Sequence, residues 1–196
     1  MKNLLSSISL LFFLCLSLAA CGPGNTVKLL PPPPIAASSL PPPSAPSVSV
    51  VAFKDSRPDP YVIGQRRDGS AFTTTGDTAN WIGRALADEL ARKGFRVTFS
   101  TDARQARNSG PNYLVTGEVN EVWLKEVSAT ELSAQMRVTC TLANKAAQIW
   151  TEPCNSSQSR TFLPGASNAD ELLLDTLNDL IKPIADKILQ TAQDKK

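Results

Sequence analysis

The sequence predicts a single small α/β (α+β) domain: a mixed sheet of about five strands with a βαβ start, an antiparallel meander and a C-terminal helix packed on the sheet. Three patterns predict this fold. Residues 47–99 follow the order strand, helix, strand, which is typical of a parallel crossover. Residues 112–156 alternate apolar and polar side chains over three runs, which indicates strands joined by short turns. Residues 168–193 have the apolar spacing of a helix with one buried face.

The N-terminus is organised like a bacterial signal peptide. After Lys2, the apolar run over residues 8–20 is 13 residues long, too short for a spanning helix, which needs about 20. The run ends in Leu18-Ala19-Ala20-Cys21, which resembles the lipobox of bacterial lipoproteins. We therefore expect residues 1–20 to be removed and Cys21 to be acylated, which would tie the protein to a lipid bilayer. Cleavage by the ordinary signal peptidase, giving a soluble secreted protein, is the alternative.

Position 22 and the proline content after it indicate where the domain is held. In bacterial lipoproteins an Asp after the acylated Cys retains the protein in the inner membrane, so Gly22 implies the outer membrane, with the domain facing the periplasm. Residues 22–46 contain nine of the chain's 15 prolines. Because proline favours extended backbone and cannot donate to a strand, residues 21–46 are predicted to be a lipidated spacer. The globular α/β domain is then expected over residues 47–193.

Composition excludes several classes of function. Residues 21–196 hold 19 Lys and Arg (20 minus Lys2) against 18 Asp and Glu, a net charge of +1 that gives no case for nucleic acid. The sequence has no His and no metal-ligand spacing, so we expect no His-dependent catalysis, no metal and no cofactor.

Cys15 leaves with the signal peptide. Cys140 and Cys154 are therefore the candidate disulfide in an oxidising periplasm, although a turn at residues 144–145 would place Cys140 opposite Ile149.

The first part of the domain is predicted to carry a strand over residues 47–53 and a hairpin over residues 61–75. Asp68-Gly69 is a type I′ turn signal. Aromatic and basic side chains on this hairpin form a candidate contact surface: Tyr61, Arg66, Arg67 and Phe72. Solvated hairpin charges are the alternative.

The apolar spacing of residues 78–93 predicts a helix, with Asp77 as N-cap and Gly94 after its last turn. A strand follows over residues 95–99, then a short helix over residues 101–108. Within the C-terminal helix, Pro183 should kink the helix or divide it in two.

The meander adds two tryptophans to the candidate contact surface, Trp123 and Trp150, which are able to stack on cell-wall sugars. Three nearby carboxylates allow a glycoside-hydrolysis interpretation: Glu118, Glu121 and Glu126. Core packing of the aromatics and a solvated strand face are the favoured alternatives.

Several segments together resemble the YajG family of lipoproteins. These are the lipobox, the proline-rich spacer, Val51-Ala52-Phe53-Lys54-Asp55-Ser56-Arg57-Pro58-Asp59, Ile63-Gly64 and Tyr113-Leu114-Val115-Thr116-Gly117-Glu118-Val119. The resemblance implies an outer-membrane lipoprotein with a small α/β domain and no established catalytic activity. In physical terms, Asp55 and Arg57 are expected to fix a loop, with a polar recognition site as the alternative.

These observations favour a non-catalytic interaction or accessory module in envelope assembly or transport. Its partner would be an unidentified envelope protein, bound through the sheet edge or the 61–75 hairpin. A binding protein for a cell-wall fragment, such as a glycan, or for a lipid is the alternative. An enzyme ranks third, since the sequence places no base near a nucleophile.

Overall fold

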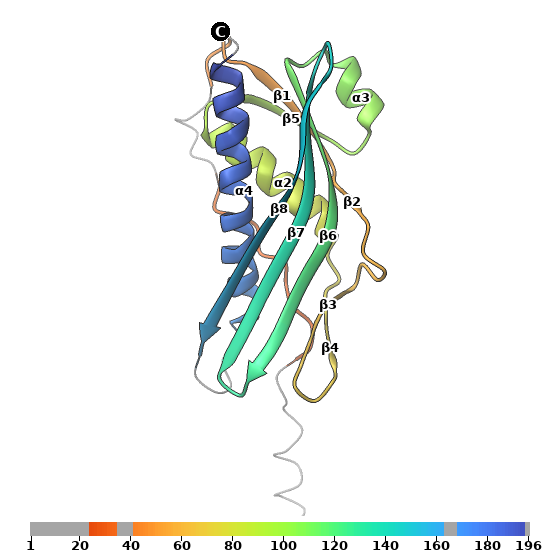
Figure 1. The fold of residues 1–196 in the computed structure, drawn as a ribbon, viewed down its shortest axis with the longest axis vertical. Coiled ribbons are helices and arrows are strands. Elements are labelled where there is room, and N and C mark those ends of the chain that lie inside the picture. The colour runs from red at the N-terminus through yellow and green to blue at the C-terminus, as the bar shows by residue number, and fades with distance from the viewer. Residues whose placement is uncertain (1–23, 35–40, 163–167, 195–196) are drawn as a thin grey trace, which may run out of the picture.

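The structure is a computed structural model that describes residues 24–34, 41–162 and 168–194. The predicted signal peptide and Cys21 lie outside these residues. Figure 1 shows three long strands with two helices against one face of the sheet and a short helix at its upper end. In chain order the elements are β1 (Ser47–Val51), β2 (Lys54–Asp55), β3 (Val62–Gln65), β4 (Ala71–Thr73), α2 (Thr78–Arg92), β5 (Arg96–Ser100), α3 (Ala103–Asn108), β6 (Tyr113–Ser128), β7 (Glu131–Asn144), β8 (Gln148–Thr161) and α4 (Ala169–Gln193).

The 16-residue strand β6 organises the sheet. Along one side of β6, the strands β1, β2 and β3 pair with it in succession, all parallel to it. Along its other side runs β7, which pairs in turn with β8, both antiparallel. β1 and β5 are parallel and joined through α2, as predicted for a crossover. The predicted fold class is therefore confirmed, and the hairpin and the short β2 join the same sheet.

The two long helices cover one face of the sheet. α2 and α4 contact each other, and α4 also lies against β7 and β8. Their apolar faces meet the inward residues of the strands in one large core. α3 covers the opposite face, where Ala106 packs with Val51 and Leu114 in a small separate cluster. Among the described residues, α3 covers one end of the outer face of the meander (Figure 1).

The ends of α2 agree with the sequence signals, whereas α4 differs from the sequence prediction at its internal proline. The Asp77 side chain accepts from the backbone N–H of Asn80, and Gly94 has a φ of 88°, as a residue after a helix often does. α4 is one helix of 25 residues with Pro183 inside it, so the predicted division does not occur. Pro183 lies on the exposed side of α4, where water can satisfy the carbonyl that loses its donor. None of the helices in the described ranges is long and apolar enough to cross a membrane.

The 61–75 hairpin forms, but its turn is not type I′. β3 and β4 pair antiparallel, and the turn closes through Gly69 N–H to the Arg66 carbonyl and Arg66 N–H to the Ser70 carbonyl. A type I′ turn needs positive φ at both central residues, whereas only Gly69, at 86°, has it here. These bonds define a three-residue loop with a glycine bulge, which needs glycine at the same position.

Part of the predicted spacer lies against the domain. The N–H of Val27 donates to the Thr73 carbonyl at 2.8 Å, and the N–H of Thr73 donates to the Asn25 carbonyl at 2.9 Å. The Val27 side chain is 3 % exposed, and the indole N–H of Trp81 donates to the Leu30 carbonyl at 2.8 Å. Residues 25–33 are thus docked along β4 and α2 instead of standing away from the domain. The apolar side chains between the prolines at 23 and 31 drive this docking.

Candidate functional site

The structure removes two members of the candidate contact surface from solvent. Phe72 is 4 % exposed and belongs to the core. Arg66 lies over the Phe72 ring at 5.3 Å, pairs with Glu126 at 3.3 Å and donates to the Asn25 side chain at 2.9 Å. These contacts join the hairpin to the end of β6. Arg67 is exposed, with its backbone N–H bonded to Glu126.

Trp123 and Trp150 lie on opposite faces of the sheet. Trp123 is opposite Gln135 on the outer face and is 38 % exposed. Trp150 is opposite the buried Leu142, so it points toward the helices and packs against the core. The ammonium of Lys187 on α4 lies 5.3 Å from its ring. One sugar cannot stack on both rings, so the two tryptophans do not make one platform.

The three carboxylates considered for glycoside hydrolysis are also separated, and each has a cation of its own. Glu118 lies 3.8 Å from Lys54, and Glu121 lies 3.4 Å from Arg137. Glu126 is held by the hairpin. An acid and a base working on one glycosidic bond must face it from both sides, whereas each of these carboxylates is paired with a different cation. Among the described residues, no three His, Cys, Asp or Glu side chains gather as metal ligands.

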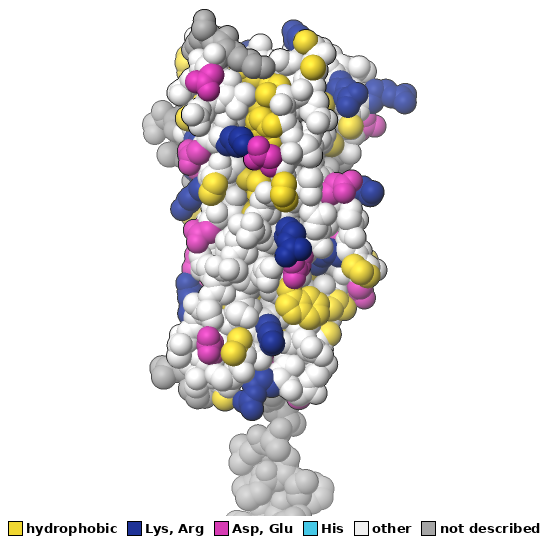
Figure 2. All heavy atoms as spheres, viewed as in Figure 1, with side chains coloured by type: hydrophobic (Ala, Val, Ile, Leu, Met, Phe, Trp, Pro, Cys, Tyr) yellow, Lys and Arg dark blue, Asp and Glu magenta, His cyan; other side chains and the backbone are white. Residues whose placement is uncertain are grey.

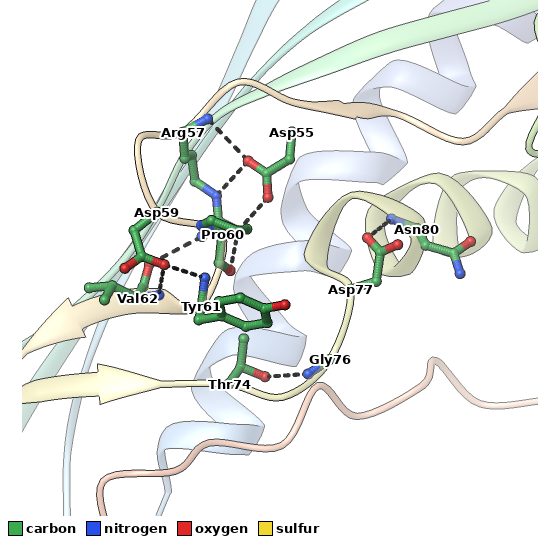
Figure 3. Close-up of polar contacts among 10 residues, drawn as sticks. All are labelled: Asp55, Arg57, Asp59, Pro60, Tyr61, Val62, Thr74, Gly76, Asp77 and Asn80. Atoms are coloured by element: carbon green, nitrogen blue, oxygen red, sulfur yellow. Dashed lines mark hydrogen bonds and ion pairs between the residues drawn. The ribbon is translucent and has the colours of Figure 1, made fainter.

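A tightly bonded loop follows β2 (Figure 3). The Arg57 guanidinium, 5 % exposed, donates to both oxygens of Asp55, at 2.9 and 2.7 Å. It also donates to the backbone carbonyls of Pro60 at 2.9 Å and Val62 at 3.3 Å. Burial alone would raise the pKa of Asp55, but the hydrogen bonds and charge of Arg57 outweigh it and hold that pKa below its usual value. The pair therefore fixes the loop, as expected from sequence.

The same loop presents Tyr61 to solvent. The Asp59 carboxylate accepts from the N–H groups of Tyr61 at 2.8 Å and Val62 at 3.3 Å, which makes an Asx-turn. The carbonyl of Tyr61 accepts from Thr74 on the other side. Its side chain is 62 % exposed. Tyr61 is thus an exposed aromatic on rigid backbone, an arrangement enriched at protein interfaces because little entropy is lost on binding.

Cys140 and Cys154 lie on adjacent strands as free thiols. Cys140 is opposite Glu152, and Cys154 is opposite Val138, so the cysteines are diagonal neighbours. The predicted register opposite Ile149 is wrong, because the β7–β8 turn is longer than two residues and the register shifts once more between Leu142 and Ala143. Burial raises the pKa of the Cys140 thiol to about 12 and also raises that of Cys154. Diagonal positions are about 7–8 Å apart, beyond the usual reach of a disulfide, so the bond stays a prediction that requires a local shift.

The edges of the sheet differ in how they are covered. Residues 25–27 pair with Thr73 and close the edge of β4. β5 is an edge of five residues. β8 is an edge of 14 residues whose one strand partner among the described residues is β7. Along β8 exposed residues alternate with half-buried ones and none is fully buried. The sequence carried one signal of an edge here, Pro153, which cannot donate to a ladder.

Polar contacts to α4 hold this edge strand in position. Lys187 pairs with Glu152, Asp175 pairs with Arg160, and Asp179 accepts from the Gln158 amide at 2.5 Å. Exposed pairs of this kind each contribute little free energy. Their consequence is geometric, since they turn one face of β8 toward α4. In the described part of the chain, no second strand pairs with the outer edge of β8.

The outer face of the meander is polar. Residues that point to this side of β7 and β8 are mainly Ser, Thr, Asn and Gln, and Thr141 and Thr151 are hydrogen-bonded across the strands at 2.7 Å. Figure 2 shows the same side as Figure 1, with a group of apolar side chains near its upper end and single apolar and charged side chains over the rest.

A hollow of about 690 Å³ lies at the α3 end of this face. Arg107, Gly110 and Pro111 line one side, and the β7–β8 turn around Lys145 lines the other. Leu114, Thr116, Thr141 and Ala143 form its floor. Two cations and no carboxylate line the hollow, so it is electrostatically suited to an anionic group. Sequence reasoning missed this site, because its residues come from two separate stretches, 107–116 and 141–148.

No protein-family model and no curated protein matches the chain, so membership of the YajG family stays a prediction. Among solved structures, protein XCC0632 from Xanthomonas campestris, of the DUF330 family, is similar with a TM-score of 0.55 and 9 % identity, covering 80 % of this chain and 93 % of that one. A PelC dodecamer from Paraburkholderia phytofirmans gives 0.45 and 17 %, covering 73 % and 91 %. Lipoprotein GNA1162 from Neisseria meningitidis gives 0.40 and 13 %, covering 72 % and 99 %. The first of these likenesses shows a shared fold.

Proposed function

We propose that this chain is a non-catalytic lipoprotein of the outer membrane, held by acylated Cys21 with its domain facing the periplasm. It acts as an interaction or accessory module in envelope assembly or transport. The Leu18–Cys21 sequence supports the anchor, and Gly22 supports the outer membrane. The fold shared with XCC0632 supports a small single-domain protein.

The observation that carries the interaction is the open edge of β8. An edge strand offers unpaired N–H and C=O groups to an extended segment of another protein, which adds to the sheet as a further strand. Residues 25–27 close the edge of β4, which belongs to the 61–75 hairpin. The edge of β8 is therefore favoured over the hairpin as the interaction surface. The pairs to α4 keep β8 in place before a partner arrives.

The chemistry of the described residues supports a non-catalytic role. Glu118, Glu121 and Glu126 are each taken up in separate ion pairs, and burial raises the pKa of Cys140 and Cys154, which disfavours the reactive thiolate. A partner that adds a strand to β8 would bring extended backbone with small polar side chains to match the polar outer face.

Photocrosslinking in the native envelope tests this proposal. A photoreactive residue in place of Asn155, exposed on β8, should yield a discrete protein adduct that mass spectrometry can identify. The matched control is the same residue in place of Arg104, exposed on α3, which packs on β1, β5 and β6. Equal or absent adducts from the two positions would contradict the role of the β8 edge.

The alternative function, a binding protein for a cell-wall fragment, has the hollow beside α3 in its favour. Its two cations, Arg107 and Lys145, would face the carboxylates of a peptidoglycan fragment. Purified sacculi should then retain the protein, and the double substitution of Arg107→Ala and Lys145→Ala should abolish retention. Retention that is unchanged by the double substitution would exclude the hollow as the site.

A further inference from the structure

The docked segment at residues 25–33 determines how far the domain can stand from the membrane. Its backbone is bonded to β4 at Val27, to α2 through Trp81, and again to α2 where the Arg92 guanidinium donates to the Pro33 carbonyl at 2.7 Å. The N–H of Lys28 also donates to the Asp170 carboxylate of α4 at 3.0 Å. Four contacts spread over three elements thus hold the segment on the domain.

The length of chain before this segment is short. Cys21 and Asn25 are four residues apart, and consecutive Cα atoms lie 3.8 Å apart, so the two residues are separated by at most about 15 Å. The headgroup layer of one leaflet is about 5–8 Å thick. With the acyl chains of Cys21 in the bilayer, the end of the domain that carries Asn25 has to lie within about 10 Å of the headgroups.

Two turns lie at that end of the domain. The Asn25 side chain accepts from Arg66 in the β3–β4 turn. Glu126, which precedes the β6–β7 turn, accepts from the Arg66 side chain at 3.3 Å and the Arg67 N–H at 3.2 Å. The β3–β4 turn (residues 65–70) and the β6–β7 turn (residues 125–130) therefore form one surface, which we term the anchor-side end. Figure 1 shows both turns at its lower end.

The chemistry of the anchor-side end fits a phospholipid surface. Its charged residues sum to +1, from Arg66, Arg67 and Lys125 against Asp68 and Glu126. Arg67 and Lys125 are exposed and able to reach lipid phosphates. Val127 is 47 % exposed, one of the few large apolar side chains exposed in the described chain. An exposed valine beside cations is suited to the headgroup boundary, where apolar atoms leave water and cations stay hydrated.

We propose that the anchor-side end rests on the phospholipid headgroups, so that the domain stands upright on the membrane with no free spacer beneath it. This inference rests on the acylation of Cys21 proposed above. β6 rises about 3.3 Å per residue, so its 16 residues carry the opposite end about 50 Å from the headgroups. The hollow with Arg107 and Lys145 lies at the end of the domain far from the bilayer, and the edge of β8 runs between that end and the anchor-side end.

Lipid photocrosslinking of the full acylated protein tests the orientation. The protein is placed in vesicles of phosphatidylethanolamine and phosphatidylglycerol, with a diazirine-bearing residue in place of Val127 or, as the matched control, of Ala146. Ala146 is exposed in the β7–β8 turn at the far end. Phospholipid adducts should be at least fivefold more abundant from position 127. Equal yields, or none from position 127, would overturn the proposal.

A second pair of variants tests whether the docked segment holds the domain down. Val27→Asp places a charge in the buried site beside Thr73, whereas Thr26→Asp adds the same charge at an exposed position. Freed residues 21–46 could extend about 75 Å, so Val27→Asp should lower the lipid adduct from position 127 several-fold relative to Thr26→Asp. Equal adducts from the two variants would show that docking does not set the height.

The mass of the N-terminal peptide separates the two proposals. An acylated Cys21 with no lipid adduct at position 127 would overturn the orientation and leave the lipoprotein intact. A Cys21 without acyl chains would overturn the anchor itself, and the orientation with it.

Discussion

Replacing Arg57 with Ala should destabilise the domain more than any other single arginine truncation in this region. The side chain is 5 % exposed and makes four hydrogen bonds, two to Asp55 and two to backbone carbonyls. Removing one partner of a buried ion pair leaves the other charge uncompensated, at a cost of about 3–5 kcal/mol. Asp55 is 19 % exposed, so water screens part of that cost, and we expect a loss of about 2–3 kcal/mol.

Thermal unfolding followed by circular dichroism measures this loss. For a domain of this size about 1 kcal/mol corresponds to about 2–4 °C, so Arg57→Ala should lower Tm by about 5–10 °C at pH 7. Arg67→Ala is the matched control, because Arg67 is exposed and bonds through its backbone N–H. We expect it to change stability by less than about 0.5 kcal/mol. A Tm for Arg57→Ala within 1–2 °C (about 0.5 kcal/mol) of the control would refute the role assigned to the pair.

The pH dependence gives a second readout of the same pair. The folded pKa of Asp55 is below its unfolded value of about 3.9. The stability contributed by its ionised form is therefore fully present above the unfolded pKa and is lost as pH falls through the folded pKa. The difference in the free energy of unfolding between wild type and Arg57→Ala should become smaller between pH 5 and pH 2. It should not reach zero, because the bonds from Arg57 to the two carbonyls remain. A difference that is independent of pH would show that Asp55 contributes nothing to stability.

Three further predictions concern other parts of the structure. Gly64→Ala places a Cβ 1.9 Å from a carbonyl oxygen of β6, so urea unfolding should show a loss of at least about 2 kcal/mol. Trp81→Phe removes the donor to the Leu30 carbonyl, which should cost about 1 kcal/mol and speed proteolysis within residues 25–34. Iodoacetamide at pH 8 should alkylate Cys154 before Cys140, since burial raises the pKa of the Cys140 thiol to about 12. Thiols that resist alkylation after denaturation without reductant would instead establish the predicted disulfide.

The elements themselves were largely predictable because their signals are local. The alternation through residues 113–127 and the cap at Asp77 each depend on neighbours a few residues away. The turn at Gly69 was placed correctly and typed wrongly, since a type I′ turn and a glycine bulge both require glycine there. The continuity of α4 through Pro183 was not predictable, because it depends on which side of the helix faces water.

The candidate contact surface was predicted less well, because exposure depends on distant segments. Phe72 and Arg66 look exposed in a hairpin sequence, yet the core and residues 25–27 take them up. Trp123 points outward because the β6–β7 register shifts between Val119 and Glu121, which reverses the alternation that begins at Tyr113, whereas Trp150 is paired with the buried Leu142. The sequence held a signal for the docking of residues 25–33, because Val27 and two leucines precede the prolines. The high proline content of the segment favoured the interpretation as a spacer instead.

The sequence by itself determined the helices and the main strands and the crossover and meander that join them, and it predicts export and acylation. Those properties follow from periodicity, caps and turn residues, which act over one to four positions in the chain. Tertiary structure decided which sheet edge is closed, which aromatic side chains reach solvent and that residues 25–33 lie against the domain. These depend on hydrogen bonds between segments up to 142 residues apart, such as Lys28 and Asp170, and no local pattern encodes them.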